Sequence, residues 1–471
     1  MVKNYLFLLP IVMFLLQGCT PFISEQPVTI IRDQWDVPHI FAETDEAAFF
    51  GAGYATAQDR LFQIHRTRRL MQGRLAELLG DNSLVEQDRK MRYLGYYRYA
   101  QERAQRLDAA TMRALKAYSA GINLYITTHK DNLLYLFDKS IPEPWTPADS
   151  LVMLDYGFAT MPSDAEVSLL HQFEDKVVEL GSSEAAFKAL APPPIIIDDS
   201  AAIVQPEDLP PQVIEEMKAY AETYPASSTY LPSSTRKMSH AFTIAGTKTT
   251  TGKPLLYSNA QLPLTLPNFW HEIHIKGATI DARGIAIPGT PGFMSGFNKH
   301  VAWGRTASAA DLGDVYRLKM VTPDTYEYGN KIYNIKAWKE TITSKNGQPE
   351  EITLKDTILG PVVTPLLQSA RPGEEYIFHA IPLIDHDIHS VQAMVATMKA
   401  QDVDTFGKAL EKWRVPPVHT IAADDQGNIG YWHTVAIPIR SSKVPLAGIM
   451  AQDASSSTMW PDILPFTFVL T

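Results

Sequence analysis

One serine of this chain, Ser239, could carry nucleophilic chemistry, and it stands in the stretch "KMSHAFTIAG". A serine hydroxyl is a weak nucleophile at neutral pH and needs an adjacent base. The G-x-S-x-G elbow that exposes the nucleophile of many α/β hydrolases does not surround Ser239. The residues alone therefore leave open what this serine could do that a surface serine could not.

Two other stretches could carry chemistry but favour structural interpretations. His271 and Glu272 in "WHEIHI" lack the second histidine of the zinc motif H-E-x-x-H, and their alternation is typical of a strand. The basic segment "DRLFQIHRTRRLMQGR" could contact a membrane or nucleic acid, but we interpret it as a solvated helix face. The formal net charge of −10 offers no basic field for nucleic acid.

The elements that must position Ser239 change character at this residue. Apolar spacing predicts helices over residues 45–79, 108–126, 148–160 and 165–190, and a further helix over 211–223 between two loops rich in proline or serine. Short strands are predicted within "VTIIRDQWDVPHIFAE", and strand-like runs dominate after Met238. A helical half followed by a strand-rich half indicates an α+β fold with helices layered on antiparallel sheets.

The N-terminus "MVKNYLFLLPIVMFLLQGCTPF" predicts export. Its apolar run is shorter than the roughly 20 residues that a membrane span requires, and it matches a secretory signal. Leu16-Gln17-Gly18-Cys19 resembles a bacterial lipoprotein processing box, which predicts a lipid tether at Cys19 in the periplasm or on the outer membrane. The alternative is an ordinary cleaved signal. Because Cys19 is the only cysteine, the mature chain would hold no disulfide.

Long blocks of the sequence resemble the penicillin acylase family of N-terminal-nucleophile hydrolases. The first block is "RDQWDVPHIFAETDEAAFFGAGYATAQDRLFQIHRTRRLMQGRLAELLG", which looks like the start of the family's α-chain. Later blocks resemble its β-chain, namely "TTTGKPLLYSNAQLPLTLPNFWHEIHI", "IPGTPGFMSGFNKHVAWGRTASAADLGDVY" and "DDQGNIGYWHTVAIPIR". The resemblance runs from residue 28 to 440, with gaps in the spacer and around 320–400.

The resemblance implies a four-layer αββα sandwich made as a precursor. Cleavage between Met238 and Ser239 would free the α-amine of Ser239, whose pKa of roughly 7.7–8.0 allows it to act as the base for its own hydroxyl. The expected parts are a signal over 1–19, an α-chain-like part over 27–190, a spacer over 191–238 and a β-chain-like part over 239–471. Cleavage would give a heterodimer from one precursor.

The resemblance also assigns supporting groups around Ser239. One oxyanion donor would be the backbone N–H of Ala307, and the second would lie at His419, where active relatives carry asparagine. An imidazole donates differently from a carboxamide, so His419 could weaken the hole, retune it or abolish turnover. Gln261 would bridge near the serine amine and Arg440 would support the site, unless both are simply satisfied polar groups. His240 and Met238 also depart from the family pattern.

A structural calcium site is a further implication of the family. Its ligands would be Asp311, the Gly313 carbonyl, Asp314 and Glu166, because oxygen ligands suit calcium. Acidic residues three apart are also common on solvated turns, so that alternative stays open.

The expected function is hydrolysis of a linear amide, such as a penicillin or an acyl-homoserine lactone, after self-cleavage at Ser239. Relatives continue well past Thr471, so we expect an incomplete C-terminal part, with a separate polypeptide as one source of the rest. The alternative is an uncleaved, inactive lipoprotein that keeps the scaffold.

Overall fold

The structure is a computed structural model. It describes residues 27–130, 141–156, 164–190, 238–262, 265–308, 310–345, 347–384, 390–440, 448, 450–455, 458–460, 462–464 and 467–470. The predicted signal with Cys19, the helix at 211–223 and the spacer up to residue 237 lie outside these residues. None of the helices in the described ranges combines the length and apolar composition of a membrane span.

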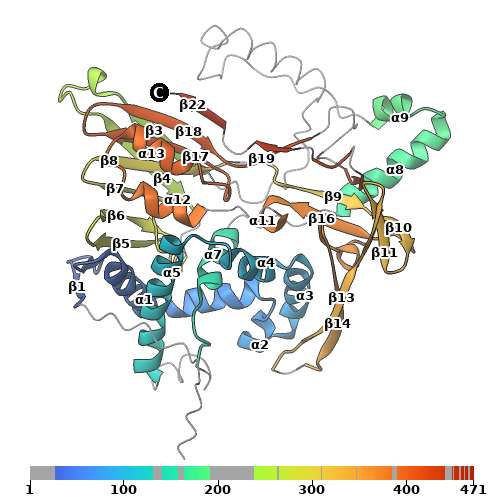
Figure 1. Ribbon diagram of the computed structural model, residues 1–471, viewed down its shortest axis with the longest axis horizontal. Coiled ribbons are helices and arrows are strands. Elements are labelled where there is room, and N and C mark those ends of the chain that lie inside the picture. The colour runs from blue at the N-terminus through green and yellow to red at the C-terminus, as the bar shows by residue number, and fades with distance from the viewer. Residues whose placement is uncertain are drawn as a thin grey trace, which may run out of the picture.

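The first half of the described chain is mainly helical (Figure 1). Its helices are α1 (Asp45–Met71), α2 (Leu75–Leu79), α3 (Val85–Leu94), α4 (Tyr96–Ala104), α5 (Ala109–Thr128), α7 (Pro147–Tyr156), α8 (Asp164–Leu180) and α9 (Ser183–Leu190). The side chains of Thr44 and Asp108 cap α1 and α5 by accepting hydrogen bonds from free N–H groups of the first turn. The predicted helix over 45–79 is interrupted at Gly73, whose φ of 64° is left-handed.

A nine-stranded sheet forms the centre of the molecule and takes strands from both halves of the sequence. Its order is β1-β2-β5-β6-β7-β8-β17-β18-β22, and every neighbouring pair is antiparallel except the parallel pair β2–β5. The bounds are β1 Thr29–Arg32, β2 Pro38–Phe41, β5 His271–Lys276, β6 Asp281–Ala286, β7 Ser295–Asn298, β8 Val301–Ala307, β17 Val418–Asp424, β18 Ile429–Thr434 and β22 Thr467–Leu470.

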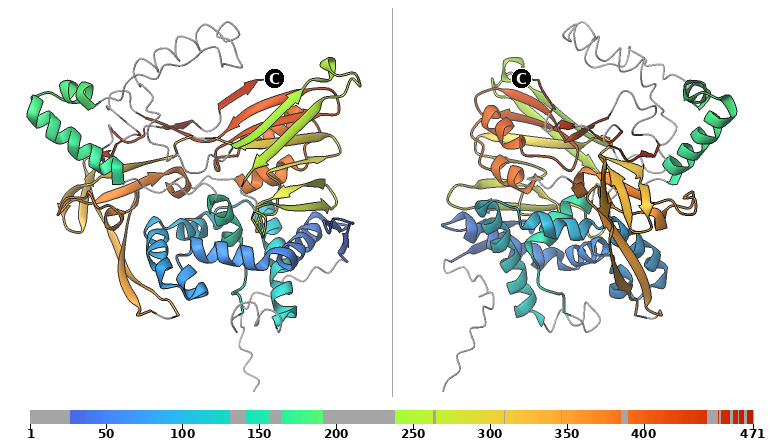
Figure 2. Two further views of the ribbon diagram at one scale, coloured as in Figure 1. Left: turned by 180° about the vertical axis from the view of Figure 1, so that it is seen from behind. Right: turned by 45° about the vertical axis from the view of Figure 1, so that its right-hand side comes forward.

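Helices cover one face of this sheet and a β-hairpin covers part of the other. Helix α1 packs on β2 and β5, while α13 (Val403–Leu410) packs on β17 and β18 with α12 (Ser390–Thr397) beside it. The hairpin of β3 (Met238–Ile244) and β4 (Leu255–Gln261) contacts β8 and β17. Figure 2 shows this hairpin lying along the sheet. The predicted α+β class is confirmed, and three of the four expected layers lie within the described ranges.

Smaller sheets form a lobe at the other side of Figure 1. They are β9 (Gly313–Arg317), β16 (Tyr376–Ala380) and β20 (Gln452–Asp453), then β10–β12 (Lys319–Thr322, Thr325–Tyr328, Lys331–Asn334), and β13–β15 (Lys336–Ile342, Glu350–Thr357, Gly360–Pro361). A further two-stranded sheet pairs β19 (Ile437–Ile439) with β21 (Asp462–Leu464). The short helix α11 (Ile381–Ile384) leads from β16 back toward the main sheet.

One apolar core joins the two halves. It contains Phe49 and Ile40 from the first half and Ile273, Trp303 and Trp432 from the second. Two helices approach closely within it, since a Cβ on Gly121 of α5 would lie 1.9 Å from the Phe50 carbonyl oxygen of α1. The frame that holds Ser239 is therefore built jointly by segments on either side of that residue.

Candidate active site

Ser239 is the second residue of β3, and the pleat directs its side chain between the two sheets. Ser239 pairs with Ala260 and Ala241 pairs with Ser258, so these four residues share one face of the hairpin. That face lies against the main sheet, because a Cβ on Gly304 of β8 would lie 2.6 Å from the Cβ of Ser258. Register and pleat thus turn Ser239 toward β8 and β17.

Ser239 opens onto a cavity of about 520 Å³. Ala307 and Ser308 at the end of β8 line the same cavity. Its walls are mostly apolar or aromatic, and they comprise Tyr156, Ala260, Leu262, Thr265, Phe269, Trp270, Ile287, Met294, Ser295, Arg305, Thr306 and Val418. Mostly apolar walls with a few polar groups are typical of a site for a small molecule.

The ladder between β8 and β17 fixes the direction of the Ala307 N–H. The neighbouring Ser308 N–H donates to the Pro417 oxygen at 3.0 Å, and successive N–H groups of a strand alternate between its two sides. The Ala307 N–H therefore points away from β17, to the side where the Arg305 N–H reaches the Ser295 hydroxyl at 3.1 Å. The Ala307 N–H is therefore a backbone donor that takes no part in the hydrogen bonds between β8 and β17.

His419 of β17 lies on the face of the main sheet that meets the hairpin. It pairs with Thr306 of β8 and His433 of β18, and it shares its face with Gly304. Its ring stacks on that of His433 with 4.7 Å between centroids, and its Nδ1 lies 2.8 Å from the Tyr431 hydroxyl. Burial lowers the pKa of His419 below its usual value, which favours the neutral ring.

Gln261 and His240 lie on the outer face of the hairpin. Gln261 pairs with Met238 and His240 pairs with Asn259, so both alternate with the inward-facing Ser239 and Ala260. Both side chains are exposed. The structure thus places Gln261 next to Ser239 along the hairpin but directs its side chain away from β8.

Arg440 lies in a separate cluster with the predicted metal ligands. Its Nε donates to Asp314 at 2.9 Å, and its Nη2 donates to Asp311 at 2.8 Å. The Trp460 indole N–H also donates to Asp314, and Glu166 accepts from the Val315 N–H at 3.3 Å. Burial and the nearby Asp314 and Asp311 charges raise the pKa of Glu166 well above its usual value, and burial raises that of Asp311 to about 6.

These contacts do not fit a calcium ion as the side chains stand. Both carboxylate oxygens of Asp314 and one of Asp311 accept hydrogen bonds from the Arg440 guanidinium. Within the described ranges, no group of three or more acidic, histidine or cysteine side chains is arranged to hold a metal ion. A cation would need Arg440 to leave the cluster.

Arg305 is a buried cation in the wall of the cavity. Its Nη1 donates to the Phe293 and Met294 oxygens at 2.8 and 2.7 Å, and its guanidinium lies 4.5 Å from the centroid of the Trp413 ring. Burial lowers its pKa to about 9. The sequence did not single out Arg305, because burial of one arginine within a strand has no signature in residue spacing.

The sequence also did not single out Ser308 and His433. The Ser308 Oγ lies 2.7 Å from His433 Nε2, although the two residues are 125 positions apart. Both were present in the stretches that resemble the family, and only the pairing of β8 with β17 and of β17 with β18 brings them together.

The two stretches that we interpreted as structural, around His271 and over the basic segment, contact other side chains of the fold. His271 Nε2 lies 3.1 Å from Asp59, and Asp59 also pairs with Arg32 at 2.7 Å. The interpretation of the basic segment as a solvated helix face is wrong at Arg68 and Arg69. Arg68 is 1% exposed and donates to the Glu143 and Pro144 oxygens, while Arg69 is buried beside Glu77, because these side chains anchor α1 to the segment before α7.

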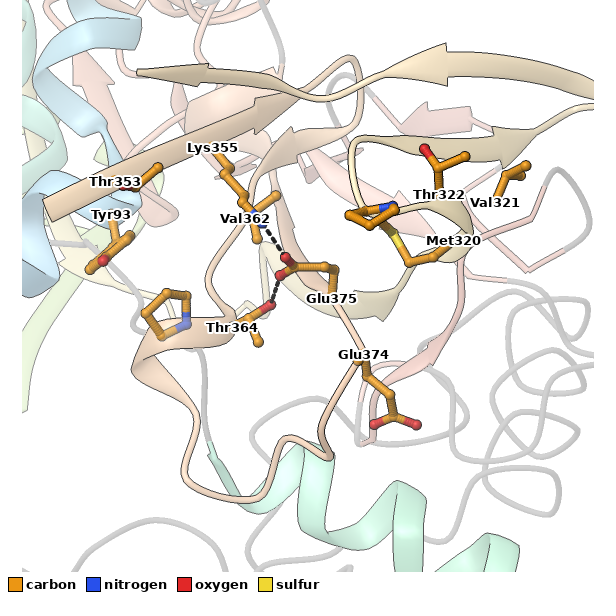
Figure 3. A pocket seen from close by; sticks show the side chains of 13 residues that line it. Tyr93, Met320, Val321, Thr322, Thr353, Lys355, Val362, Thr364, Glu374 and Glu375 are labelled. Carbon is orange, nitrogen blue, oxygen red and sulfur yellow. Dashed lines mark hydrogen bonds and ion pairs between the residues drawn. The ribbon is translucent and has the colours of Figure 1, made fainter. Parts of the chain in front are cut away.

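A larger cavity, of about 580 Å³, lies in the lobe of small sheets (Figure 3). Its charged groups satisfy one another, since Glu375 accepts from the Thr364 hydroxyl at 2.6 Å and pairs with Lys355. Tyr93 and Thr353 line it, and Ser239 does not. The geometry therefore favours the Ser239 cavity as the reactive one.

Comparison with known proteins identifies the family of the chain. A model of the family "Penicillin amidase" matches residues 27–468. Penicillin G acylase of Escherichia coli is 26% identical over 95% of this chain and 58% of its own length, and the acyl-homoserine lactone acylase QuiP of Pseudomonas aeruginosa is 27% identical over 88% and 50%. The chain thus spans little more than half the length of these relatives.

A solved structure, the thermostable penicillin G acylase from Alcaligenes faecalis, matches with a TM-score of 0.42 and 23% identity over 48% of this chain and 40% of its own. The family match extends over nearly the whole described chain and confirms what the sequence blocks predicted: this protein belongs to the penicillin amidase family.

Proposed function

We propose that this chain is the precursor of a linear amide hydrolase, and that scission before Ser239 makes this serine the nucleophile. The observation that carries the proposal is that Ser239 and Ala307 line one cavity, with the Ala307 N–H turned away from the β8–β17 ladder. Scission before Ser239 would make its α-amine the base that takes the hydroxyl proton.

The catalytic step follows from these positions. The Ser239 Oγ bonds to the amide carbon as its proton passes to the α-amine, and the oxyanion accepts from the Ala307 N–H and from His419. Collapse releases the amine, which takes the proton, and water then hydrolyses the ester. Each well-placed oxyanion donor contributes about 2.7–4 kcal/mol to lowering the barrier.

The test is the state of the peptide bond before Ser239. We expect a denaturing gel of the full chain to show two fragments, with N-terminal sequencing placing Ser239 at the start of one. Ser239→Ala should give one uncut chain, and Ser239→Cys should still be cut. Ser258→Ala, a serine on the same inner face, is the matched control and should be cut as well. An uncut native chain would instead support the alternative of an inactive protein that keeps the scaffold. His419, at the position where the resemblance predicts asparagine, favours that alternative.

The substrate is proposed to be a small N-acyl amide. Related proteins bear the names penicillin G acylase and acyl-homoserine lactone acylase, and the aromatic and apolar cavity walls suit an aromatic or aliphatic acyl group. Hydrolysis of a chromogenic phenylacetyl anilide and of N-decanoyl homoserine lactone separates the two choices.

We also propose export to the periplasm with a lipid tether at Cys19, which metabolic labelling with a fatty acid and a Cys19→Ser control would test.

We propose separately that this cluster can bind calcium once the Arg440 guanidinium leaves it. If the ion binds Glu166, Asp311, Asp314 and the Gly313 carbonyl, adding calcium to chelator-treated protein should raise the melting temperature, and Asp314→Asn should remove that effect. An unchanged melting temperature would indicate that the Arg440 guanidinium neutralises the cluster instead.

A further inference from the structure

Ser308, which the proposed mechanism does not use, lines the same cavity as Ser239 and lies beside His433. The Ser308 Oγ and His433 Nε2 are 2.7 Å apart, a short distance for a hydroxyl and a ring nitrogen. Ser308 lines the cavity, and both side chains are partly exposed. A hydroxyl within hydrogen-bond reach of an imidazole is the basic arrangement of an activated nucleophile.

The strands hold both groups in place. The Ser308 N–H donates to the Pro417 oxygen at 3.0 Å, which fixes the residue at the end of β8. His433 lies two strands away, in β18, on the face of the sheet that carries His419 and Thr306. Because pairing and pleat put Ser308 on this face too, the pair is directed toward the hairpin layer that holds Ser239.

The surroundings suit proton transfer from serine to histidine. Burial, together with the neighbouring His419, lowers the pKa of His433, which keeps the ring neutral and able to accept a proton near neutral pH. The Ala310 N–H lies 3.3 Å from the Ser308 Oγ and donates to it, which lowers the cost of negative charge on that oxygen.

We propose that Ser308 and His433 form a second nucleophile and base in this cavity, able to accept an acyl group from a carboxylic ester without scission at Ser239. The inference rests on the proposed function only in that the cavity must admit an acyl group. It differs in its nucleophile, its base and its independence of a free α-amine.

Acyl transfer to Ser308 and its reversal by hydrolysis need no reactant other than the ester and water. As the Ser308 Oγ bonds to the ester carbon, its proton passes to His433 Nε2. The bond to the leaving alcohol breaks, and the imidazolium returns the proton to that alcohol. Water then attacks the acyl-serine with its proton passing to His433, and collapse releases the acid while Ser308 regains its hydrogen.

The experiment is to treat the full chain with p-nitrophenyl acetate, follow release of p-nitrophenol, and map the acetyl group by mass spectrometry of peptides. We expect acetylation on Ser308, also in the Ser239→Ala chain. Ser308→Ala should lose this adduct and Ser308→Cys should keep it. His433→Gln, which can still accept the serine hydrogen bond but is no base, should slow acetylation by about 100-fold.

A structural role for the pair would give different results. Acetylation confined to Ser239, no adduct at all in the folded wild-type chain, or an unchanged rate in His433→Gln would each overturn the inference. N-terminal sequencing of the same samples reports scission at Ser239 separately. An uncut chain acetylated on Ser308 would oppose the proposed function and support this inference, and a cut chain without that adduct would do the reverse.

Discussion

His419 stands where the family resemblance predicts an asparagine, and its contacts suggest how it could serve as an oxyanion donor. A neutral imidazole that accepts the Tyr431 hydroxyl at Nδ1 carries its own hydrogen on Nε2 and can donate there. We expect His419→Asn to raise the rate of amide hydrolysis in self-cleaved protein, by about tenfold, because it supplies the carboxamide donor that the family resemblance predicts at this position.

A matched variant separates donation from packing. Tyr431→Phe keeps the ring beside His419 but removes the hydroxyl that orients it, so hydrolysis should fall if Nε2 is the donor. Steady-state rates on one amide substrate compare the variants. Identical rates for wild type, His419→Asn and Tyr431→Phe would indicate that His419 is not part of the oxyanion hole.

The sequence can predict a site residue where the residues that flank it along the chain identify its position. Ser239 and Ala307 could be placed by their flanking blocks, and they line the same cavity. Ser308 and His433 could not, since their contact depends on the register of three strands. Arg440, to which the resemblance assigns support of the site, lies beside Asp311 and Asp314 and donates hydrogen bonds to both carboxylates. The roles of these residues stay predictions.

At the scale of elements, helix α1 contains a buried histidine that should make stability sensitive to acid. Burial, followed by the charges of Arg68, Arg69 and Arg74, lowers the pKa of His65 to about 3. The unfolded chain, with a pKa near 6.5, binds a proton that the folded chain refuses between these values. The contribution of His65 to the free energy of unfolding is therefore fully present above about pH 6.5 and is lost as the pH falls below that value.

This linkage predicts a loss of about 2 kcal/mol between pH 7 and pH 5 from His65 alone. His65→Gln can still accept the hydrogen bond that Arg68 Nη2 donates at 2.9 Å but does not titrate in this range. Urea unfolding at both pH values should show the smaller loss in the variant. Equal losses in the two proteins would indicate that the histidine is protonated in the folded state as well.

Element types were more predictable than element ends. The predicted helices at 108–126 and 165–190 correspond to α5 and to α8 with α9, and Gly181, with φ of 67°, separates the last two. Helices α3 and α4 were not predicted, because their apolar residues are interspersed with charges that pair across the molecule, such as Arg89 with Glu350 at 2.7 Å. The strands at 29–41 were predicted, but their pairing with β5 was not.

At the scale of the molecule, the parallel pairing of β2 with β5 joins the part before Ser239 to the part after it. His39, Ile40 and Phe41 pair with His274, Ile275 and Lys276, and both parts contribute to one apolar core. Scission at Ser239 breaks one peptide bond and none of these contacts. The fragments should therefore remain one particle.

We expect cut protein, whether self-cleaved or cut at a protease site inserted within residues 191–237, to elute as a single peak in gel filtration and to give two bands only after denaturation. Ile40→Asp should separate the fragments, because Ile40 is 0% exposed and an unpaired carboxylate in the core costs several kcal/mol. Ile31→Asp on neighbouring β1 is the control, since Ile31 is 55% exposed and its change should leave the peak intact. Two peaks from the cut wild-type protein would contradict a shared sheet and core, because fragments joined by the β2–β5 pair and by one apolar core should separate only when that core unfolds.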